Sequence, residues 1–281
     1  MSRRQGLVLV CALVALSAVP AAAQSPDPAA VRAGKTFIQT AVYSLEDDQR
    51  LLALFDGLRV ADVTDGMDAV GLQNVGLMDP EIRPLWKDLE RFSHRIIGVA
   101  VTARYVPTNR HSAGRMASVE EYDRWAGDWY NKLSGEPFAE ALRQGSILVI
   151  DDASEADVGS IGSNNIMFWK TRGMVGVVTN ATARDTDEII VERVPLYFRR
   201  PGRGIRPGRN EIESVNRPIV CGGVLVMPGD VVVGDGDGVV VVPRAHADAV
   251  GRYAHAVIEK DKAARRKLYE QLQMTPDATV K

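Results

Sequence analysis

One segment near the end of this chain constrains the fold more than any other. Pro228–Pro243 reads PGDVVVGDGDGVVVVP, in which two valine-rich runs flank the glycine- and aspartate-rich stretch Gly234–Gly238. Valine favours extended backbone, whereas glycine and aspartate favour tight turns. The segment therefore predicts a β-hairpin, and we expect the glycines of its turn to supply positive φ angles.

Strand-like and helical segments alternate over the rest of the chain. Runs of β-branched and aliphatic residues predict strands at Arg95–Tyr105, Ser146–Asp151, Met174–Thr179, Ile189–Val194 and Ile219–Met227. Helical periodicity predicts helices over Leu45–Leu58 and from Ala245 to about Gln273, and another near Val60 with Asp62 or Thr64 as its cap. No repeat and no linker marks a second domain.

The N-terminus has the composition of an export signal. Arg3 and Arg4 precede the apolar run Leu7–Val19, and small residues lead to Ala23. This order predicts a secretory signal peptide over residues 1–23, so we expect an exported protein that is periplasmic or secreted. The apolar run is too short to span a bilayer permanently, and we expect no membrane anchor once the signal peptide is cleaved. The arginine pair leaves general secretion and twin-arginine export both open.

Behind the signal we expect an export linker over residues 24–44, a single domain over residues 45–273 and a tail over residues 274–281. The domain contains an aromatic segment at about 107–140, in which Tyr122, Trp125, Trp129 and Tyr130 recur at helical spacing. That spacing predicts an amphipathic helix. Ordinary packing of its aromatic face, a lid over a substrate and an oligomer contact are the open interpretations.

Composition excludes several functional classes. The 281 residues carry a formal net charge of −2, so we expect no broad surface for nucleic acid. The arginine-rich stretch Arg199–Arg209 is short and lacks interleaved aromatic residues, which indicates a solvated loop. Cys221 is the only cysteine behind the signal peptide, so we expect no disulfide within the mature chain and a small core residue. The 4 histidines lack zinc-type spacing.

The strongest chemical signal lies in the segment Gly162–Asp187. Its opening residues, Gly-Ser-Asn-Asn, predict a tight turn into a helix over Asn164–Lys170, with Ser163 as the N-cap and Gly173 just past the end. The amides of residues 163–165 would then lie at the helix start. Such a start binds carboxylate or enolate oxygens through its unpaired N–H groups and the helix dipole.

Arg184 and Asp185 follow the predicted strand Met174–Thr179 after a short loop. Ligands of open α/β sheets gather at the carboxyl ends of the strands. An arginine there can hold a carboxylate through two hydrogen bonds, and an aspartate can hold Mg²⁺ or Mn²⁺. A surface ion pair is the competing interpretation, and the residues alone leave both open.

The order and spacing of these residues resemble a known family. Gly162 and Ser163, then 20 residues, then Arg184-Asp185 is similar to the signature G-(D/E)-x20-R-D of the RraA-like proteins. This family includes the class II 4-hydroxy-4-methyl-2-oxoglutarate and 4-carboxy-4-hydroxy-2-oxoadipate aldolases. The resemblance extends through VADVTDGM, RIIGVAVTARY, GMVGVVTNATARDTDEI and CGGVLVMPGDVVVGDGDGVVVVP. It covers about Val60 to Glu259 and leaves the aromatic segment unmatched.

The resemblance implies a fold, an assembly and a reaction. The fold is an α/β, αββα-type sandwich with a swivelling β/β/α-like core, and the assembly is a homotrimer or hexamer with its site between subunits. In the aldolases a divalent metal holds a 2-oxo acid, and retro-aldol cleavage releases pyruvate. Oxaloacetate decarboxylation proceeds through the same pyruvate enolate. A metal-dependent lyase acting on a small oxo acid is therefore the first functional hypothesis.

The resemblance also assigns roles by position. Arg184 would bind substrate oxygens and steady the enolate, and Asp185 would anchor Mg²⁺ or Mn²⁺. A carboxylate from the C-terminal helix of a neighbouring subunit contributes in the aldolases, and Glu259 is the counterpart in this chain. The substrate-binding residues that the resemblance implies are Gly162, Ser163, Asn164, Asn165 and Arg184.

One residue departs from the family pattern. The aldolases carry an acid where this chain has Ser163, and a serine cannot replace a carboxylate as a base near neutral pH. Ser163 can still orient a water molecule, so it stays with Arg184 among the candidate catalytic residues. The departure motivates a second hypothesis, a non-catalytic ligand-binding or protein-interaction member of the family. A methyltransferase is disfavoured, because no glycine-rich cofactor loop follows a first strand.

Overall fold

The computed structural model describes residues 27–111, 113–152 and 157–281. The predicted signal peptide lies outside these residues. The described residues divide into two units between Gln39 and Thr40. In the first unit, the short helix α1 (Pro28–Arg32) begins at Asp27, whose side chain accepts a hydrogen bond from the Ala29 amide. All elements below belong to the second unit.

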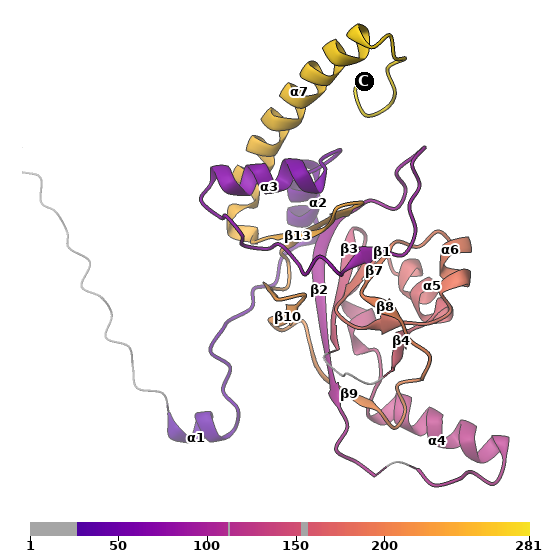
Figure 1. The fold of residues 1–281 in the computed structure, drawn as a ribbon. Helices are drawn as coiled ribbons and strands as arrows, with labels where there is room; N and C mark the ends of the chain where they lie inside the picture. The colour runs from indigo at the N-terminus through magenta and orange to yellow at the C-terminus, as the bar shows by residue number, and fades with distance from the viewer. Residues whose placement is uncertain (1–26, 112, 153–156) are drawn as a thin grey trace, which may run out of the picture. The chain divides into compact units, whose positions relative to one another are not determined.

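A mixed sheet of 8 strands forms the centre of the second unit (Figure 1). Its strands run in the order β1-β7-β5-β3-β2-β12-β13, and β9 pairs with β2. The bounds are β1 Arg83–Pro84, β2 Ile96–Pro107, β3 Ser146–Asp152, β5 Met174–Thr179, β7 Leu196–Phe198, β9 Asn210–Val215, β12 Val231–Asp235 and β13 Gly238–Val242. The neighbours β2, β3, β5 and β7 are parallel, so their carboxyl ends share one edge.

Two smaller sheets accompany the main sheet. The strands β4 (Gly159–Ile161), β6 (Thr182–Ala183) and β8 (Arg200–Pro201) form a parallel sheet of 3 strands. The strands β10 (Ile219–Cys221) and β11 (Val224–Val226) form a hairpin. The sequence predicts one strand over Ile219–Met227, and that prediction is wrong: Gly222 and Gly223 take φ angles of 56° and 78° and reverse the chain.

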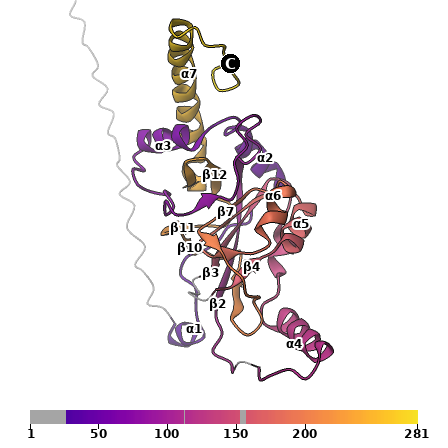
Figure 2. The ribbon, with the colours of Figure 1, turned by 45° about the vertical axis from the view of Figure 1, so that its right-hand side comes forward.

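The helices cover two parts of the main sheet (Figure 1). Their bounds are α2 Leu45–Ala53, α3 Val60–Ala69, α4 Val119–Lys132, α5 Ser163–Thr171, α6 Thr186–Val191 and α7 Ala247–Gln271, with 3₁₀ turns η1 Pro137–Ala141 and η2 Arg244–His246. Apolar residues of α5 and α6 pack with those of β3 and β5, whereas α2, α3 and α7 pack on β12 and β13. The views in Figures 1 and 2 both show α3 and α7 together, away from α5 and α6.

The hairpin predicted from the valine-rich runs is present, with β12 and β13 paired antiparallel. Every residue of β12 and β13 is buried, and alternate valines enter two different apolar clusters on opposite faces of the sheet. Each fully buried valine contributes roughly 1.5 kcal/mol or more to folding. The prediction that the turn glycines share positive φ is wrong except at Gly238, because the turn itself is Gly236-Asp237 and Gly234 lies inside β12.

The ends of the main sheet approach one another. The Met78 amide donates to the Val239 carbonyl at 3.1 Å, and the Arg83 guanidinium donates to the Asp237 carbonyl at 2.9 Å. These bonds join the β1 side to β13 at the opposite end of the strand order, so the sheet is nearly closed into a barrel. The enclosed face carries a core of Ile, Val and Tyr197, together with Cys221.

Cys221 is fully buried, as the sequence predicts. Burial raises the pKa of its thiol to about 12, which leaves the sulfur protonated and unreactive at neutral pH.

Two further local predictions are wrong. Ile189–Val194 is predicted as a strand, but α6 covers Thr186–Val191 and Ile189 packs into the core from it. The acidic pair Asp187 and Glu188 lies in the first turn, where negative charge favours a helix over the β-branched preference. The cap of α3 is Arg59, and Asp62 accepts the Arg59 amide from the third helical position.

No helix within the described residues is long and apolar enough to cross a membrane.

Candidate active site

The candidate site lies at the carboxyl ends of the small parallel sheet. Gly162 follows β4 directly, and Arg184 follows β6 directly. The Arg184 amide donates to the Ile161 carbonyl at 2.8 Å, which fixes the two strand ends side by side. The sequence therefore folds so that residues 22 positions apart meet, with Ser163 beside Asp185.

The start of α5 is built around Asp185. Gly162 is the N-cap residue and the helix begins at Ser163, so the prediction that Ser163 itself is the N-cap is wrong by one position. The Asp185 Oδ2 atom accepts the Ser163 amide at 3.1 Å and the Ser163 hydroxyl at 3.4 Å. A side chain from another element thus takes the place of a local cap. At the other end, Gly173 follows the cap residue with φ of 94°, as predicted.

The amides that follow Ser163 remain available for a ligand. Asn164 and Asn165 belong to the first turn of α5, whose N–H groups have no carbonyl partner within an α-helix. Ser163 and Asn165 are half-buried and Asn164 is exposed. An anion placed there would meet amide hydrogens and the positive end of the helix dipole.

Gly162 leaves a small polar cradle because it has no side chain. A Cβ atom at this position would lie 2.8 Å from Asp185 Oδ2 and 3.6 Å from both Arg184 Nε and Asn165 Oδ1. The glycine takes φ of −125°, which any residue can adopt, so its requirement is space and not backbone conformation. Three groups of different chemistry therefore face one point: a carboxylate, a guanidinium and an amide oxygen.

Arg184 and Asp185 form a loose pair that solvent reaches. The Arg184 Nε atom lies 3.8 Å from Asp185 Oδ1, and the two side chains are 38% and 37% exposed. The Arg184 side chain runs over Gly159, where an added Cβ would lie 2.7 Å from the Arg184 Cβ. Asp185 takes φ of 56°, a left-handed conformation that costs an ordinary residue free energy. The fold accepts this strain where the chain presents the carboxylate.

A second arginine–carboxylate pair lies behind the first turn of α5, and sequence reasoning missed it. Arg206 is buried and forms an ion pair with Glu136. Glu136 also accepts the Asn165 side-chain amide at 2.6 Å and the Trp169 indole N–H at 2.8 Å, so it contacts α5 twice. The only available signal was Glu136 itself, an acid shortly after the aromatic helix α4 with no characteristic spacing.

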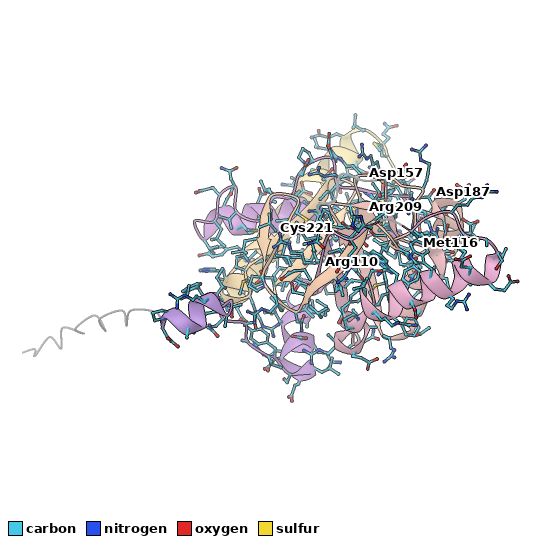
Figure 3. The ribbon with its side chains drawn as sticks, turned by 90° about the horizontal axis from the view of Figure 1, so that it is seen from below. Arg110, Met116, Asp157, Asp187, Arg209 and Cys221 are labelled. Carbon is cyan, nitrogen blue, oxygen red and sulfur yellow. The ribbon has the colours of Figure 1, made fainter. Side chains whose placement is uncertain are left out.

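The prediction of a solvated arginine-rich loop is correct for most of its arginines and wrong for Arg206. Arg203 is exposed and pairs with Asp157. Arg209 and Asp157, both labelled in Figure 3, lie against Gly204 in this region. Arg206 instead turns inward, donates to the Ser134 carbonyl at 3.0 Å and lies over the rings of Tyr105 and Tyr130.

The aromatic helix α4 combines packing with a contribution near the site. Trp129 is buried and its indole N–H donates to the Asn210 carbonyl at 3.0 Å, as ordinary packing requires. Tyr130 lies near two cations: burial raises the pKa of its phenol, and the charges of Arg206 and Arg184 act in the opposite direction. The helix therefore brings a phenol ring beside the Arg206 guanidinium.

Two aspartates end β3 at the same edge of the main sheet. Asp151 is buried, accepts the Asn180 side-chain amide at 2.8 Å and lies 3.3 Å from the Arg104 guanidinium. Asp152 is buried and accepts hydrogen bonds from Ser160 and from Asn210, the latter at 2.7 Å. These carboxylates hold loops together next to the site and do not join the group around Gly162.

Glu259 is not brought together with the other candidate residues within one chain. It lies on α7, is largely exposed and has Lys262 Nζ at 3.9 Å. The helix α7 packs with α3, β12 and β13, whereas Arg184 follows β6 of the small parallel sheet, so different parts of the fold carry Glu259 and Arg184. The role implied by the resemblance requires a neighbouring subunit.

The donor atoms fit a hard divalent cation. No group of three or more His, Cys, Asp and Glu side chains within the described ranges is placed to hold a metal ion. Around Gly162, however, Asp185, Ser163 and Asn165 present a carboxylate, a hydroxyl and an amide oxygen. Mg²⁺ commonly takes only one or two protein carboxylates and fills its other positions with water and substrate oxygens. The set therefore suits Mg²⁺ or Mn²⁺ and not a zinc site of His and Cys.

Comparison with known proteins identifies relatives of this chain. A family model described as RraA-like, Aldolase/RraA, matches residues 60–241. A Halalkalibacterium halodurans protein provisionally named 4-hydroxy-4-methyl-2-oxoglutarate aldolase is 32% identical over 123 residues, which is 43% of this chain. The aligned part spans 58% of that relative's length. The similarity therefore reaches part of the relative only.

Solved structures share the fold. An uncharacterized protein from Pseudomonas syringae superimposes with a TM-score of 0.61 at 25% identity, covering 85% of this chain and 97% of that one. Streptomyces coelicolor RraAS2, described as an unusual member of the RNase ES inhibitor RraA family, gives a TM-score of 0.59 at 24% identity, over 78% and 96% of the two chains. The predicted fold class, an α/β sandwich with an RraA-like core, is confirmed.

Proposed function

This chain belongs to the RraA-like family, and we propose that it is a divalent-metal-dependent lyase. Its substrate would be a 2-oxo or 4-hydroxy-2-oxo di- or tricarboxylic acid, and its product pyruvate. The observation that supports this most is the cradle at Gly162, around which Asp185, Arg184 and the first turn of α5 converge. Aldolase-named relatives make a lyase plausible at the level of the family.

The chain's own groups suit the charges of such a substrate. The amides of Asn164 and Asn165 would bind one carboxylate at the start of α5. Arg184, partly exposed and directed past Gly162, would hold a second carboxylate or the oxygen on which negative charge develops. Asp185, with the Ser163 hydroxyl beside it, would hold the cation. When bound, the ion supplies Lewis-acid stabilisation of the developing enolate charge.

The same carbon–carbon bond breaks in retro-aldol cleavage and in decarboxylation. The C3–C4 bond of the substrate breaks, its electron pair forms the enolate of pyruvate, and a proton from solvent ends on C3. Retro-aldol cleavage also requires the 4-hydroxyl to lose its proton as C4 becomes a carbonyl. Decarboxylation of oxaloacetate requires no such base, because CO₂ leaves directly.

Ser163 therefore bears on which reaction is favoured. General base help is worth about 10²–10⁴-fold, and a serine cannot supply it near neutral pH. Its hydroxyl already lies 3.4 Å from Asp185 Oδ2 and can hold a water there. We expect oxaloacetate decarboxylation to exceed retro-aldol cleavage in this protein.

The proposal includes a location and an assembly. The apolar run Leu7–Val19 behind Arg3 and Arg4 supports export to the periplasm or beyond. The isolated position of Glu259 supports a homotrimer or hexamer, in which a neighbouring subunit would bring this carboxylate to the site. Cell fractionation tests the first statement and light scattering the second.

A pyruvate-release assay tests the activity. Purified protein with Mn²⁺ should release pyruvate from oxaloacetate, and Asp185→Asn should lower the rate by about 100-fold or more because the ion loses its charged ligand. Ser163→Asp should increase cleavage of a 4-hydroxy-2-oxo diacid by about tenfold or more. Absence of release from every oxo acid tested, with Asp185→Asn indistinguishable from wild type, would falsify the lyase proposal.

The second candidate function is a non-catalytic binder of the same ligands, and Ser163 is the observation that favours it. Calorimetry separates the two. Binding of an oxo acid without turnover supports the binder, whereas metal-dependent release of pyruvate from that acid excludes it.

A further inference from the structure

We propose that the side-chain oxygen of Asn165 is a second protein donor to the cation, and that Glu136 is the residue that positions it. This inference rests on the proposed function, because it concerns the same cation. Where the family pattern has an acid, this chain has Ser163, and the compensating oxygen would come from Asn165, two residues further along α5.

The orientation of Asn165 follows from its partner. The Asn165 Nδ2 atom donates to Glu136 Oε1 at 2.6 Å. A carboxylate in an ion pair can only accept, so the NH₂ group must face Glu136 and the amide oxygen must face the other way. That oxygen lies 3.6 Å from the point that a Cβ of Gly162 would occupy, and Asp185 Oδ2 lies 2.8 Å from the same point. An uncharged oxygen and a charged oxygen therefore border one cradle.

Glu136 is itself held in place from behind. The buried guanidinium of Arg206 pairs with its Oε1, and the Trp169 indole donates to its Oε2 at 2.8 Å. Arg206 is fixed in turn by the Tyr105 hydroxyl and the Ser134 carbonyl. The carboxylate cannot rotate without breaking these bonds, so it orients Asn165 as partners of metal ligands orient them elsewhere.

The chemical consequence concerns charge. Of the described groups around Gly162, Asp185 alone carries a negative charge that could face the cation, because Ser163 and Asn165 are neutral. The ion then keeps more positive charge for a substrate with several carboxylates. The arrangement suits a di- or tricarboxylate better than a monocarboxylate.

Binding of Mn²⁺ alone to the full chain tests the proposal without using activity. Free Mn²⁺ is measured by electron paramagnetic resonance during a titration. Asn165→Leu keeps the size of the side chain and removes the oxygen, so it should weaken Mn²⁺ binding by roughly tenfold, whereas Asn165→Asp keeps an oxygen and should bind at least as tightly as wild type. Wild-type affinity in Asn165→Leu overturns the proposal.

Removing the charge of Glu136, and then exchanging donor and acceptor in a double variant, tests Glu136 as a positioning residue. Glu136→Gln presents an NH₂ group to Asn165 or to Arg206 and should weaken Mn²⁺ binding by roughly tenfold. In the double variant Glu136→Gln with Asn165→Asp, donor and acceptor change places, and affinity should return to within about threefold of wild type. A purely structural role for Glu136 predicts instead that Glu136→Gln weakens Mn²⁺ binding by the same factor in the Asn165→Asp variant as in the protein with Asn165 unchanged.

Two further variants complete the design. Glu140→Gln removes a carboxylate from the same segment, one that is exposed and pairs with Arg172 at 3.1 Å, and should leave Mn²⁺ binding unchanged. Asp185→Asn should abolish binding. If Asp185→Asn binds Mn²⁺ like wild type, the proposed function loses its metal site and this inference fails with it. If Asp185→Asn abolishes binding and Asn165→Leu does not weaken it, only the inference about Asn165 and Glu136 is overturned.

Discussion

Two arginine–carboxylate pairs flank the first turn of α5 and differ in almost every physical respect. The outer pair, Arg184 and Asp185, is adjacent in sequence, 3.8 Å apart and more than a third exposed on both sides. The inner pair, Arg206 and Glu136, is separated by 70 residues, in direct contact and largely buried, with side-chain exposures of 3% and 17%. The outer pair remains accessible to a ligand although Asp185 also accepts hydrogen bonds from Ser163, whereas the inner pair is enclosed by its protein partners.

An arginine and a carboxylate therefore serve different functions according to their surroundings. Exposed pairs contribute about 0–1 kcal/mol to stability, because water competes for both partners. A buried pair contributes little net stability when intact, yet removal of one partner leaves a charge without compensation. We therefore expect mutations of the inner pair to affect folding and mutations of the outer pair to affect chemistry.

The largest expected effect is on stability and falls on the inner pair. Arg206→Met removes the guanidinium and leaves Glu136 buried without its cation, so the free energy of unfolding should fall by roughly 3–5 kcal/mol. Equilibrium denaturation in urea measures it. The matched control is Arg203→Met in the same loop, whose side chain is 91% exposed. It should change stability by less than about 0.5 kcal/mol. Equal effects of the two variants would remove the distinction between buried and exposed pairs.

The next effect falls on the outer pair and on activity. Arg184→Met should lower metal-dependent pyruvate release by roughly 100- to 1,000-fold, the usual cost of losing a group that stabilises developing negative charge. Its free energy of unfolding should change by less than about 1 kcal/mol, because the pair with Asp185 is long and exposed. Pyruvate-release assays and urea denaturation of Arg184→Met and wild type measure the two effects. A stable variant with full activity would place Arg184 outside the chemistry.

Gly162 lies between the two pairs and supports a smaller prediction. Gly162→Ala adds a Cβ 2.8 Å from Asp185 Oδ2, so the carboxylate or the turn must shift. Such crowding costs roughly 1–3 kcal/mol of stability. The effect should fall on the outer pair: Mn²⁺ affinity should drop together with stability, while the Arg206–Glu136 pair stays intact. A crystal structure of the variant with Asp185 unmoved and Mn²⁺ binding unchanged would contradict this expectation.

Much of the fold could be predicted from local sequence. The β12–β13 hairpin, β5 and α7 correspond to strong periodic or β-branched signals that tertiary contacts reinforce. The strand predicted over residues 189–194 was wrong because tertiary contacts oppose the local preference there. Its β-branched residues indicate a strand, but the backbone after Asp185 and the acidic first turn place them in α6. Local preference was overridden by the geometry of the site.

The residues of the candidate site also fall into those that the sequence predicts and those that it does not. Arg184, Asp185 and the start of α5 are close in sequence and carry a spacing that can be recognised, so they could be predicted. Glu136 and Arg206 could not, because nothing in one sequence indicates that an acid after an aromatic helix and an arginine in a basic loop will meet. Long-range polar contacts depend on the whole packing arrangement, which local patterns do not encode.

A third pair, Arg104 and Asp151, lies between the two extremes and gives the smallest and sharpest test. Asp151 is buried, whereas the Arg104 side chain is 46% exposed and 3.3 Å away. Burial raises the pKa of the Asp151 carboxyl, and the Asn180 amide and the Arg104 charge only partly offset it. The native state therefore binds the Asp151 proton more tightly than the unfolded state does. The free energy of unfolding that this bound proton contributes is fully present below the ordinary aspartate pKa of about 3.9. It is lost as pH rises through the raised pKa of the native state.

The variant Asp151→Asn isolates this contribution, because its amide cannot titrate. Relative to Asp151→Asn, the wild-type free energy of unfolding should decline as pH increases from about 3.9 through the raised native pKa, and should then stay level. Urea denaturation of both proteins at a series of pH values measures the difference. A wild-type stability that instead rises against Asp151→Asn over this interval would mean that Arg104 dominates over burial. The pair would then act like an ordinary stabilising ion pair, and a half-exposed arginine would be sufficient to offset the burial of a carboxylate.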